Sequence, residues 1–210
     1  MSSLVFFDLD GTLSDPQVGI VRCIRHALEQ LDVSCDDNLD WCIGPPLHDS
    51  FETLVGSHRV AQAVHLYRQR FAQIGWQENV LYAGIPEVLR SLNTAGHTLY
   101  VATSKPLVFA QQIIEHFGIA DSFARVFGSE LDGTRSDKGA LLRYALAQTG
   151  AQGRVSMIGD RKFDIDGARQ NAMRSIGVTY GYGGRAELVA AGADAIVNAP
   201  DEVLAALDCT

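Results

Sequence analysis

The strongest constraint on the fold is the alternation of short apolar runs with helical patterns from about residue 84 to the end of the chain. Short runs bounded by turn residues are typical of buried strands, and apolar residues three or four apart are typical of helices. Strands are expected at 98–102, 124–127, 155–158, 175–178 and 195–197, and helices at about 85–94, 106–118, 137–148 and 164–172. Because such apolar strands must be covered on both faces, the pattern predicts an α/β fold with a doubly wound, Rossmann-like parallel sheet.

A helical block separates the first expected strand, Leu4–Phe7, from the rest of that sheet. Asp15 can cap a helix whose first position is Pro16. Apolar residues further along the chain recur at spacings of four and three residues, and this stripe predicts another helix. Gly44-Pro45-Pro46 breaks the chain between this helix and the one that begins at Pro16. The stripe consists of Val60, Val64, Tyr67, Phe71 and Ile74. No strand is expected between residues 8 and 97. We therefore predict a core formed by 1–14 and 83–210, with an all-helical cap inserted at 15–82.

Composition excludes several classes of protein. The 210 residues carry a formal net charge of −8, which argues against a nucleic acid polymer or an anionic membrane as partner. No window is long and apolar enough to span a membrane, and the expected location is cytoplasmic. The four cysteines have no metal-site spacing and are expected to be reduced thiols: Cys23, Cys35, Cys42 and Cys209. Monomer and homodimer both remain open.

Two carboxylates, Asp8 and Asp10, directly follow the first strand in Asp8-Leu9-Asp10-Gly11-Thr12. At the end of a strand, one of them can face a ligand while the other flanks it, and Gly11 allows the backbone to approach that ligand closely. A carboxylate that attacks a phosphoryl group forms an aspartyl-phosphate and divides a hard hydrolysis into two easier steps. A near repeat, Glu130–Thr134, is separated from the run at 124–127 by Gly128-Ser129, and we interpret it as a plain turn.

Three more polar clusters follow the ends of expected strands or open a helix: Thr103-Ser104-Lys105, Ser136-Asp137-Lys138 and Gly159–Asp164. Each cluster alone could be a helix cap or a turn. Together they meet at the carboxyl edge of a parallel sheet, where ligands bind. Several carboxylates around one point need a cation, and oxygen ligands without His or Cys indicate Mg²⁺. Lys162, in contrast, is expected to face solvent.

With these motifs, the chain resembles the haloacid dehalogenase-like phosphatases with a helical cap, and more narrowly the bacterial phosphoglycolate phosphatase-type enzymes. The motifs are D-x-D-G-T at 8–12, T-S-K-P at 103–106, a lysine at 138 and G-D-x-x-x-D at 159–164. The cap-loop residues 44–47 and the segment Tyr180–Gly183 are similar as well. One departure is that Lys138 precedes Gly139, where this subgroup often has proline.

The resemblance implies a role for each matching residue. Asp8 would be the nucleophile, and Asp10 the general acid and then the general base. Thr103 and Ser104 would bind phosphoryl oxygens, and Lys138 would balance their charge. Mg²⁺ would be held by Asp8, the Asp10 carbonyl, Asp160 and Asp164. Substrate contacts are expected from Gly11, Ser104, Lys105, Gly44, Pro45 and Leu47.

The expected substrate is a small phosphorylated metabolite. Phosphoglycolate or a similar short phosphorylated acid is favoured, and a nucleoside 5′-monophosphate, the substrate of a 5′-nucleotidase, is the alternative. Positive charge at the site is expected mainly from Lys105, Lys138 and the metal. A phosphomutase shares every motif and stays open. A dehalogenase would lack an acid at position 10, and a phosphorylated receiver module would lack the helical insert.

Overall fold

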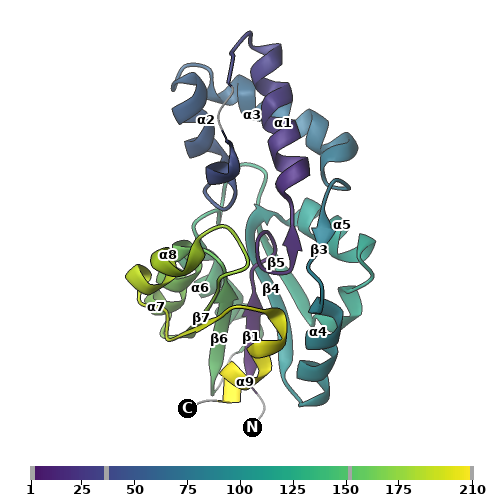
Figure 1. Cartoon of the computed structure of the whole chain (residues 1–210), viewed down its shortest axis with the longest axis vertical. Coiled ribbons are helices and arrows are strands. Elements are labelled where there is room, and N and C mark those ends of the chain that lie inside the picture. Colours follow the sequence, from purple (N-terminus) through teal and green to yellow (C-terminus); the bar gives the residue numbers. More distant parts are fainter. Residues whose placement is uncertain (1–2, 36–37, 151–152, 209–210) are drawn as a thin grey trace.

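Six parallel strands form the sheet at the centre of the computed structural model, which describes residues 3–35, 38–150 and 153–208. The order across the sheet is β5-β4-β1-β6-β7-β8 (Figure 1). The strands are β1 (Leu4–Phe7), β4 (Thr98–Pro106), β5 (Arg125–Ser129), β6 (Val155–Gly159), β7 (Arg174–Val178) and β8 (Ala195–Val197). The predicted parallel sheet is confirmed, and Asp8 and Asp160 follow neighbouring strands.

Helices cover both faces of the sheet, as predicted for a doubly wound fold. Phe6 packs toward α6 (Lys138–Thr149) and α7 (Lys162–Gln170), and α8 (Gly184–Ala191) packs against α7 and β7. On either side of Phe6, Val5 and Phe7 point to the other face, which is covered by α4 (Ile85–Thr94), α5 (Leu107–His116) and α9 (Val203–Asp208). All three strand residues are almost fully buried because a central strand has no solvent-facing side in this fold. Single 3₁₀ turns occur at Ala120–Ser122 and Pro200–Glu202.

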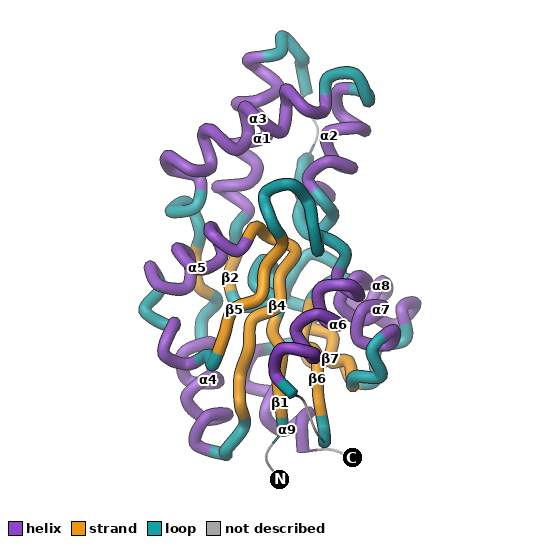
Figure 2. The backbone as a smooth tube through the Cα atoms, turned by 180° about the vertical axis from the view of Figure 1, so that it is seen from behind, coloured by secondary structure: helices purple, strands orange, loops and turns teal. Residues whose placement is uncertain are grey.

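A group of helices lies beyond the carboxyl edge of the sheet (Figures 1 and 2). It consists of α1 (Gln17–Gln30), α2 (Leu47–Val55) and α3 (Val60–Arg70), with a 3₁₀ turn at Asp40–Cys42 and a π-helical turn at Phe71–Gly75. We call residues 17–75 the helical insert. Its limits of 15 and 82 as a separate domain stay a prediction. None of the helices in the described residues is both long and apolar enough to cross a membrane.

The expectation of no strand between residues 8 and 97 is wrong. β2 (Ser14–Asp15) and β3 (Val80–Leu81) pair in antiparallel fashion where the chain enters and leaves the helical insert. Strands of two residues are too short to produce a hydrophobic period, so the sequence gave no signal for them. The first insert helix begins at Gln17, directly after Pro16, and the Asp15 carboxylate accepts a hydrogen bond of 2.9 Å from the Gln17 N–H.

Several element ends also differ from the predictions. β4 continues to Pro106 and β5 to Ser129, because a register shift between Thr103 and Pro106 lets Ser129 pair as well. Glu130 therefore follows a strand directly, contrary to the expectation, although 130–135 is a turn as predicted. Helix α7 begins two residues early, and α2, α8 and α9 were not predicted. The thiols of Cys23, Cys35 and Cys42 are free, and Cys209 lies outside the described residues.

Candidate active site

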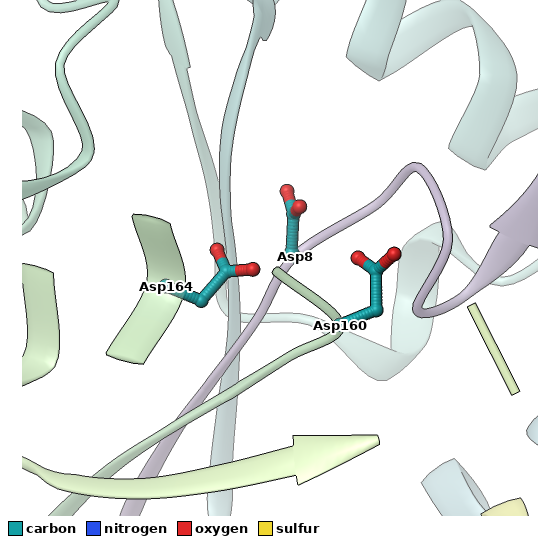
Figure 3. Close-up of side chains that lie close together, drawn as sticks. All are labelled: Asp8, Asp160 and Asp164. Carbon is teal, nitrogen blue, oxygen red and sulfur yellow. The ribbon is translucent and has the colours of Figure 1, made fainter. Parts of the chain in front are cut away.

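Three buried carboxylates meet at the carboxyl edge of the sheet. Asp8 follows β1, Asp160 follows β6, and Asp164 lies in the first turn of α7, which starts from the same loop as Asp160. One oxygen from each lies within 4.8 Å of the others, and Figure 3 shows the three carboxylates gathered around one point. Because β1 and β6 are hydrogen-bonded neighbours, the topology itself places two of these groups side by side.

Lys138 is the cation of this cluster. Its Nζ lies 3.0 Å from Asp8 Oδ1 and 2.8 Å from Asp164 Oδ1, and it donates a hydrogen bond of 2.9 Å to the Ala102 carbonyl. The residue opens helix α6, whose N-cap Asp137 accepts from the Ala140 N–H as expected. Burial lowers the pKa of Lys138, but Asp164 and Asp8 outweigh it and raise that pKa above its ordinary value. The ammonium therefore stays charged at neutral pH.

Asp160 has no lysine or arginine at ion-pair distance within the described part of the chain. Its carboxylate accepts hydrogen bonds from the Tyr182 N–H at 2.8 Å and from the Thr12 hydroxyl at 3.4 Å. Burial, and then the charges of Asp164 and Asp8, raise the pKa of Asp160 well above its ordinary value. Gly11 lies against this carboxylate, and a Cβ there would fall 2.2 Å from Asp160 Oδ2. Gly11 is thus placed beside a candidate ligand and does not line the cavity described below.

These residues fit a divalent cation. Four carboxylates, those of Asp8, Asp10, Asp160 and Asp164, are balanced by only two lysine charges, from Lys138 and Lys105. Burial also raises the pKa of Asp164, with Lys138 opposing it. A site with two excess negative charges and only oxygen donors matches the ligand chemistry of Mg²⁺.

Asp10 and Lys105 form a second buried ion pair, with Lys105 Nζ 2.6 Å from Asp10 Oδ2. The same ammonium lies 4.7 Å from the ring centre of Phe71, which belongs to the helical insert. Burial raises the pKa of Asp10, and Lys105 counters part of this effect. Lys105 also lines the cavity described below, so its predicted contact with substrate stays a prediction.

Thr103 and Ser104 lie at the end of β4, next to β1. Thr103 is buried, and its hydroxyl oxygen accepts a hydrogen bond of 3.2 Å from the Lys105 N–H, which leaves the hydroxyl proton available to an incoming anion. The Ser104 carbonyl is occupied by the Ser129 hydroxyl at 2.8 Å. Both residues line the same cavity as Asp8 and Asp10.

That cavity has a volume of about 460 Å³ and lies between the sheet edge and the helical insert. Its insert side is largely apolar and includes the predicted loop residues Gly44, Pro45 and Leu47. Further apolar lining comes from Ile20, Val64, Tyr67, Phe71 and Phe109. Sequence reasoning missed the polar lining residues His48 and Arg68 and the turn at 130–133, which is the near repeat interpreted as a plain turn. Arg68 lies four residues after Val64 of the predicted stripe, so helical spacing could have placed it on the same face.

Comparisons with known proteins agree with this geometry. The model of the family described as haloacid dehalogenase-like hydrolase matches residues 5–178. A 5′-nucleotidase of Pseudomonas aeruginosa is 47% identical over 189 residues, covering 88% of this chain and 86% of the relative. Tyrosine-protein kinase PtkA of Mycobacterium tuberculosis is 40% identical over 89% of this chain, but the match spans only 65% of that relative.

A phosphoglycolate phosphatase of Vibrio parahaemolyticus is 28% identical over 96% of this chain and 94% of the relative. Among solved structures, a predicted phosphatase from Clostridium acetobutylicum superimposes with a TM-score of 0.94 at 42% identity, covering 99% of this chain and 98% of the other. The architecture is therefore shared along the whole chain, helical insert included.

Proposed function

The chain belongs to the haloacid dehalogenase-like hydrolases and is a phosphatase of phosphomonoesters, and we propose that it acts with Mg²⁺ through an aspartyl-phosphate on Asp8. The observation that carries the proposal is the buried Asp8–Asp160–Asp164 cluster with Lys138, open to a cavity of about 460 Å³. Without a phosphoryl group and a metal to hold, so many buried carboxylates would be costly for the fold.

The residues divide the reaction between them. An Asp8 oxygen attacks phosphorus, and the bond from phosphorus to the leaving oxygen breaks while Asp10 gives its proton to that oxygen. Asp10 then accepts a proton from the water that attacks the aspartyl-phosphate, which releases inorganic phosphate and restores Asp8. Such general acid–base help contributes about 10²–10⁴-fold to the rate. The raised pKa of Asp10 favours the protonated form that the first step needs.

The remaining polar groups stabilise charge. Lys138 and the Thr103 hydroxyl would bind phosphoryl oxygens, and the N–H groups around Ser104 would add donors. Asp8, the Asp10 carbonyl, Asp160 and Asp164 would hold Mg²⁺, which supplies positive charge where a phosphate dianion meets the anionic nucleophile. Asp160 is the natural direct ligand because it has no cation of its own, whereas Asp164 is paired with Lys138 at 2.8 Å.

For the substrate, the cavity favours a nucleoside 5′-monophosphate over phosphoglycolate. Its volume of about 460 Å³ lies within the range of about 300–1,000 Å³ that encloses drug-sized ligands. A two-carbon acid would leave most of it empty. The apolar and aromatic lining from Tyr67, Phe71 and Phe109 suits a flat base, and the similarity to a 5′-nucleotidase points the same way. Arg68 offers a donor to base or sugar oxygens, since it makes no ion pair within the described residues.

The test is a phosphate-release screen with Mg²⁺ over nucleoside monophosphates, phosphoglycolate and p-nitrophenyl phosphate, ranked by kcat/KM. A nucleotide should rank first, and EDTA should abolish release. If phosphoglycolate ranked first, the proposed nucleotide substrate would be wrong, but the proposed reaction through an aspartyl-phosphate would stand. Transfer of the phosphoryl group to a sugar phosphate, with little free phosphate, would identify a phosphomutase instead.

A further inference from the structure

One side chain connects the carboxylate loop to the helical insert. Arg161 lies in the loop that carries Asp160, yet its Nη1 donates a hydrogen bond to the carbonyl of Ile43, a residue of the insert. Its Nε donates to Glu187 Oε1 at 2.9 Å, so the guanidinium joins the sheet core to the insert. The side chain is only 12% exposed, which limits the competition from water for both contacts.

The neighbouring glycine shows how closely this contact is fitted. Gly44 follows Ile43 and has a φ of +104°, a conformation that side chains rarely adopt. A Cβ on Gly44 would also lie 2.9 Å from both Cγ and Nη1 of Arg161. The arginine therefore fills the space that a side chain at residue 44 would need. Pro45 and Leu47, which come next, line the cavity. Because Arg161 holds residues 43 and 44 in place, it also holds the part of the cavity wall that follows them in the chain.

Arg161 is equally well fixed on the core side. Glu187 Oε1, which holds its Nε, also accepts a hydrogen bond of 2.8 Å from the Lys162 N–H. The backbone N–H of Arg161 itself donates to Asp164 Oδ2 at 3.1 Å. One residue thus contacts a candidate metal-site carboxylate through its backbone and the cap loop through its side chain.

We infer that Arg161 is a positioning residue that holds the cap loop, residues 43–47, over the cavity when substrate is bound. A guanidinium is required because its separate N–H groups reach Glu187 and the Ile43 carbonyl together, whereas an ammonium is a point charge. The inference concerns cap-loop position and rests on the proposed function only where activity is its readout. Arg161 touches neither the reacting atoms nor the cavity lining, so its loss should weaken binding of the leaving group more than the chemical step.

The kinetic test compares Arg161→Ala and Arg161→Lys with Arg169→Ala. Arg169 lies on helix α7, which begins directly after Arg161, but it is exposed, and it contacts Asp166 and the Ala191 carbonyl, both within the core. For the best nucleotide, both Arg161 variants should raise KM on the order of ten-fold, the size expected for one lost hydrogen bond to a charged group. For p-nitrophenyl phosphate, which needs little from the cap, KM should change less than two-fold. Arg169→Ala should leave both unchanged.

A second readout needs no activity. Trp41 lies two residues before Ile43 and is 42% exposed, so in a Trp76→Phe background its fluorescence anisotropy reports on the mobility of the cap loop. The anisotropy should fall in Arg161→Lys and stay constant in Arg169→Ala. Equal KM changes for both substrates, or an unchanged Trp41 anisotropy in a folded Arg161 variant, would overturn the inference. If the wild type releases phosphate from no substrate, the proposed function is wrong. The Trp41 anisotropy still tests whether Arg161 positions the cap loop.

Discussion

Replacing Lys138 by methionine should destabilise the metal-free protein strongly and in a pH-dependent way. The ammonium lies 3.0 Å from Asp8 and 2.8 Å from Asp164, and its side chain is only 4% exposed. Methionine fills most of the same space, so the variant removes the charge without opening a large cavity. Removing one partner of a buried ion pair costs about 3–5 kcal/mol. Here two carboxylates lose their partner, and we expect the upper part of that range at pH 8.

The sign of the pH dependence follows from the carboxylates. Without Lys138, which opposes the effect of burial on Asp164, the folded-state pKa of Asp164 rises further, and burial and mutual repulsion already raise that of Asp160. Groups whose pKa is raised on folding stabilise the protein fully below their unfolded value of about 4, and this contribution is lost as the pH rises through the folded-state pKa. The cost of Lys138→Met should therefore be smaller at pH 5 than at pH 8.

The measurement is urea unfolding in EDTA at both pH values, with Lys162→Met as the matched control because Lys162 is exposed. The control should change the free energy of unfolding by less than about 0.5 kcal/mol. Addition of Mg²⁺ should recover part of the loss in Lys138→Met, since the ion supplies the missing positive charge. A variant as stable as the wild type at pH 8, or a loss that is equal at both pH values, would refute the electrostatic reasoning.

Four further outcomes are expected. Asp8→Asn should abolish phosphate release while leaving the circular dichroism spectrum unchanged, and Asp10→Asn should accumulate an enzyme heavier by one phosphoryl group in intact-mass measurements with a good leaving group. In titration calorimetry, Asp160→Ala should weaken Mg²⁺ binding more than Asp164→Ala. The carboxylate of Asp164 is already paired with Lys138, whereas that of Asp160 is not and is the one expected to bind the ion directly. Leu47→Ala should raise KM for the best nucleotide several-fold and hardly change it for p-nitrophenyl phosphate; equal changes would mean that the loop contributes no recognition.

The elements that could be predicted are those with a local signal. An apolar strand that ends in Asp8 is visible in the sequence, and the rule that parallel strands end at one edge places Asp160 beside it. The sequence therefore predicts that Asp8, Asp160 and Asp164 gather at this edge, and the structure brings them together. The helical insert was visible in the spacing of its apolar stripe. Substrate preference could not be predicted from the sequence, because it depends on the volume of the cavity between the sheet edge and the helical insert.

The contacts that could not be predicted are long-range pairings of polar groups. Arg161 donates a hydrogen bond to the Ile43 carbonyl, 118 positions away in the sequence. Every residue has a backbone carbonyl, so the residue type at position 43 gives no sign of this contact. The contacts of Lys105 with Asp10 and with the ring of Phe71 were likewise not predicted. Ile43 and Phe71 belong to the helical insert, so these two contacts depend on where the insert lies relative to the core; the Lys105–Asp10 pair lies within the core.

The core and the helical insert differ in how far their residues can change without affecting the groups proposed for chemistry. The groups proposed for chemistry come from strand ends and the starts of helices α6 and α7, whose positions the sheet fixes. Much of the apolar lining of the cavity comes from the insert, and Phe109 and the turn at 130–133 of the core contribute as well. Lys105 of the core and Arg68 of the insert both line the cavity, and the expectation that the core supplies most of the positive charge stays a prediction. Changing the insert can thus alter substrate choice at little cost to the carboxylate cluster, and relatives that share this fold can differ in the molecules they act on.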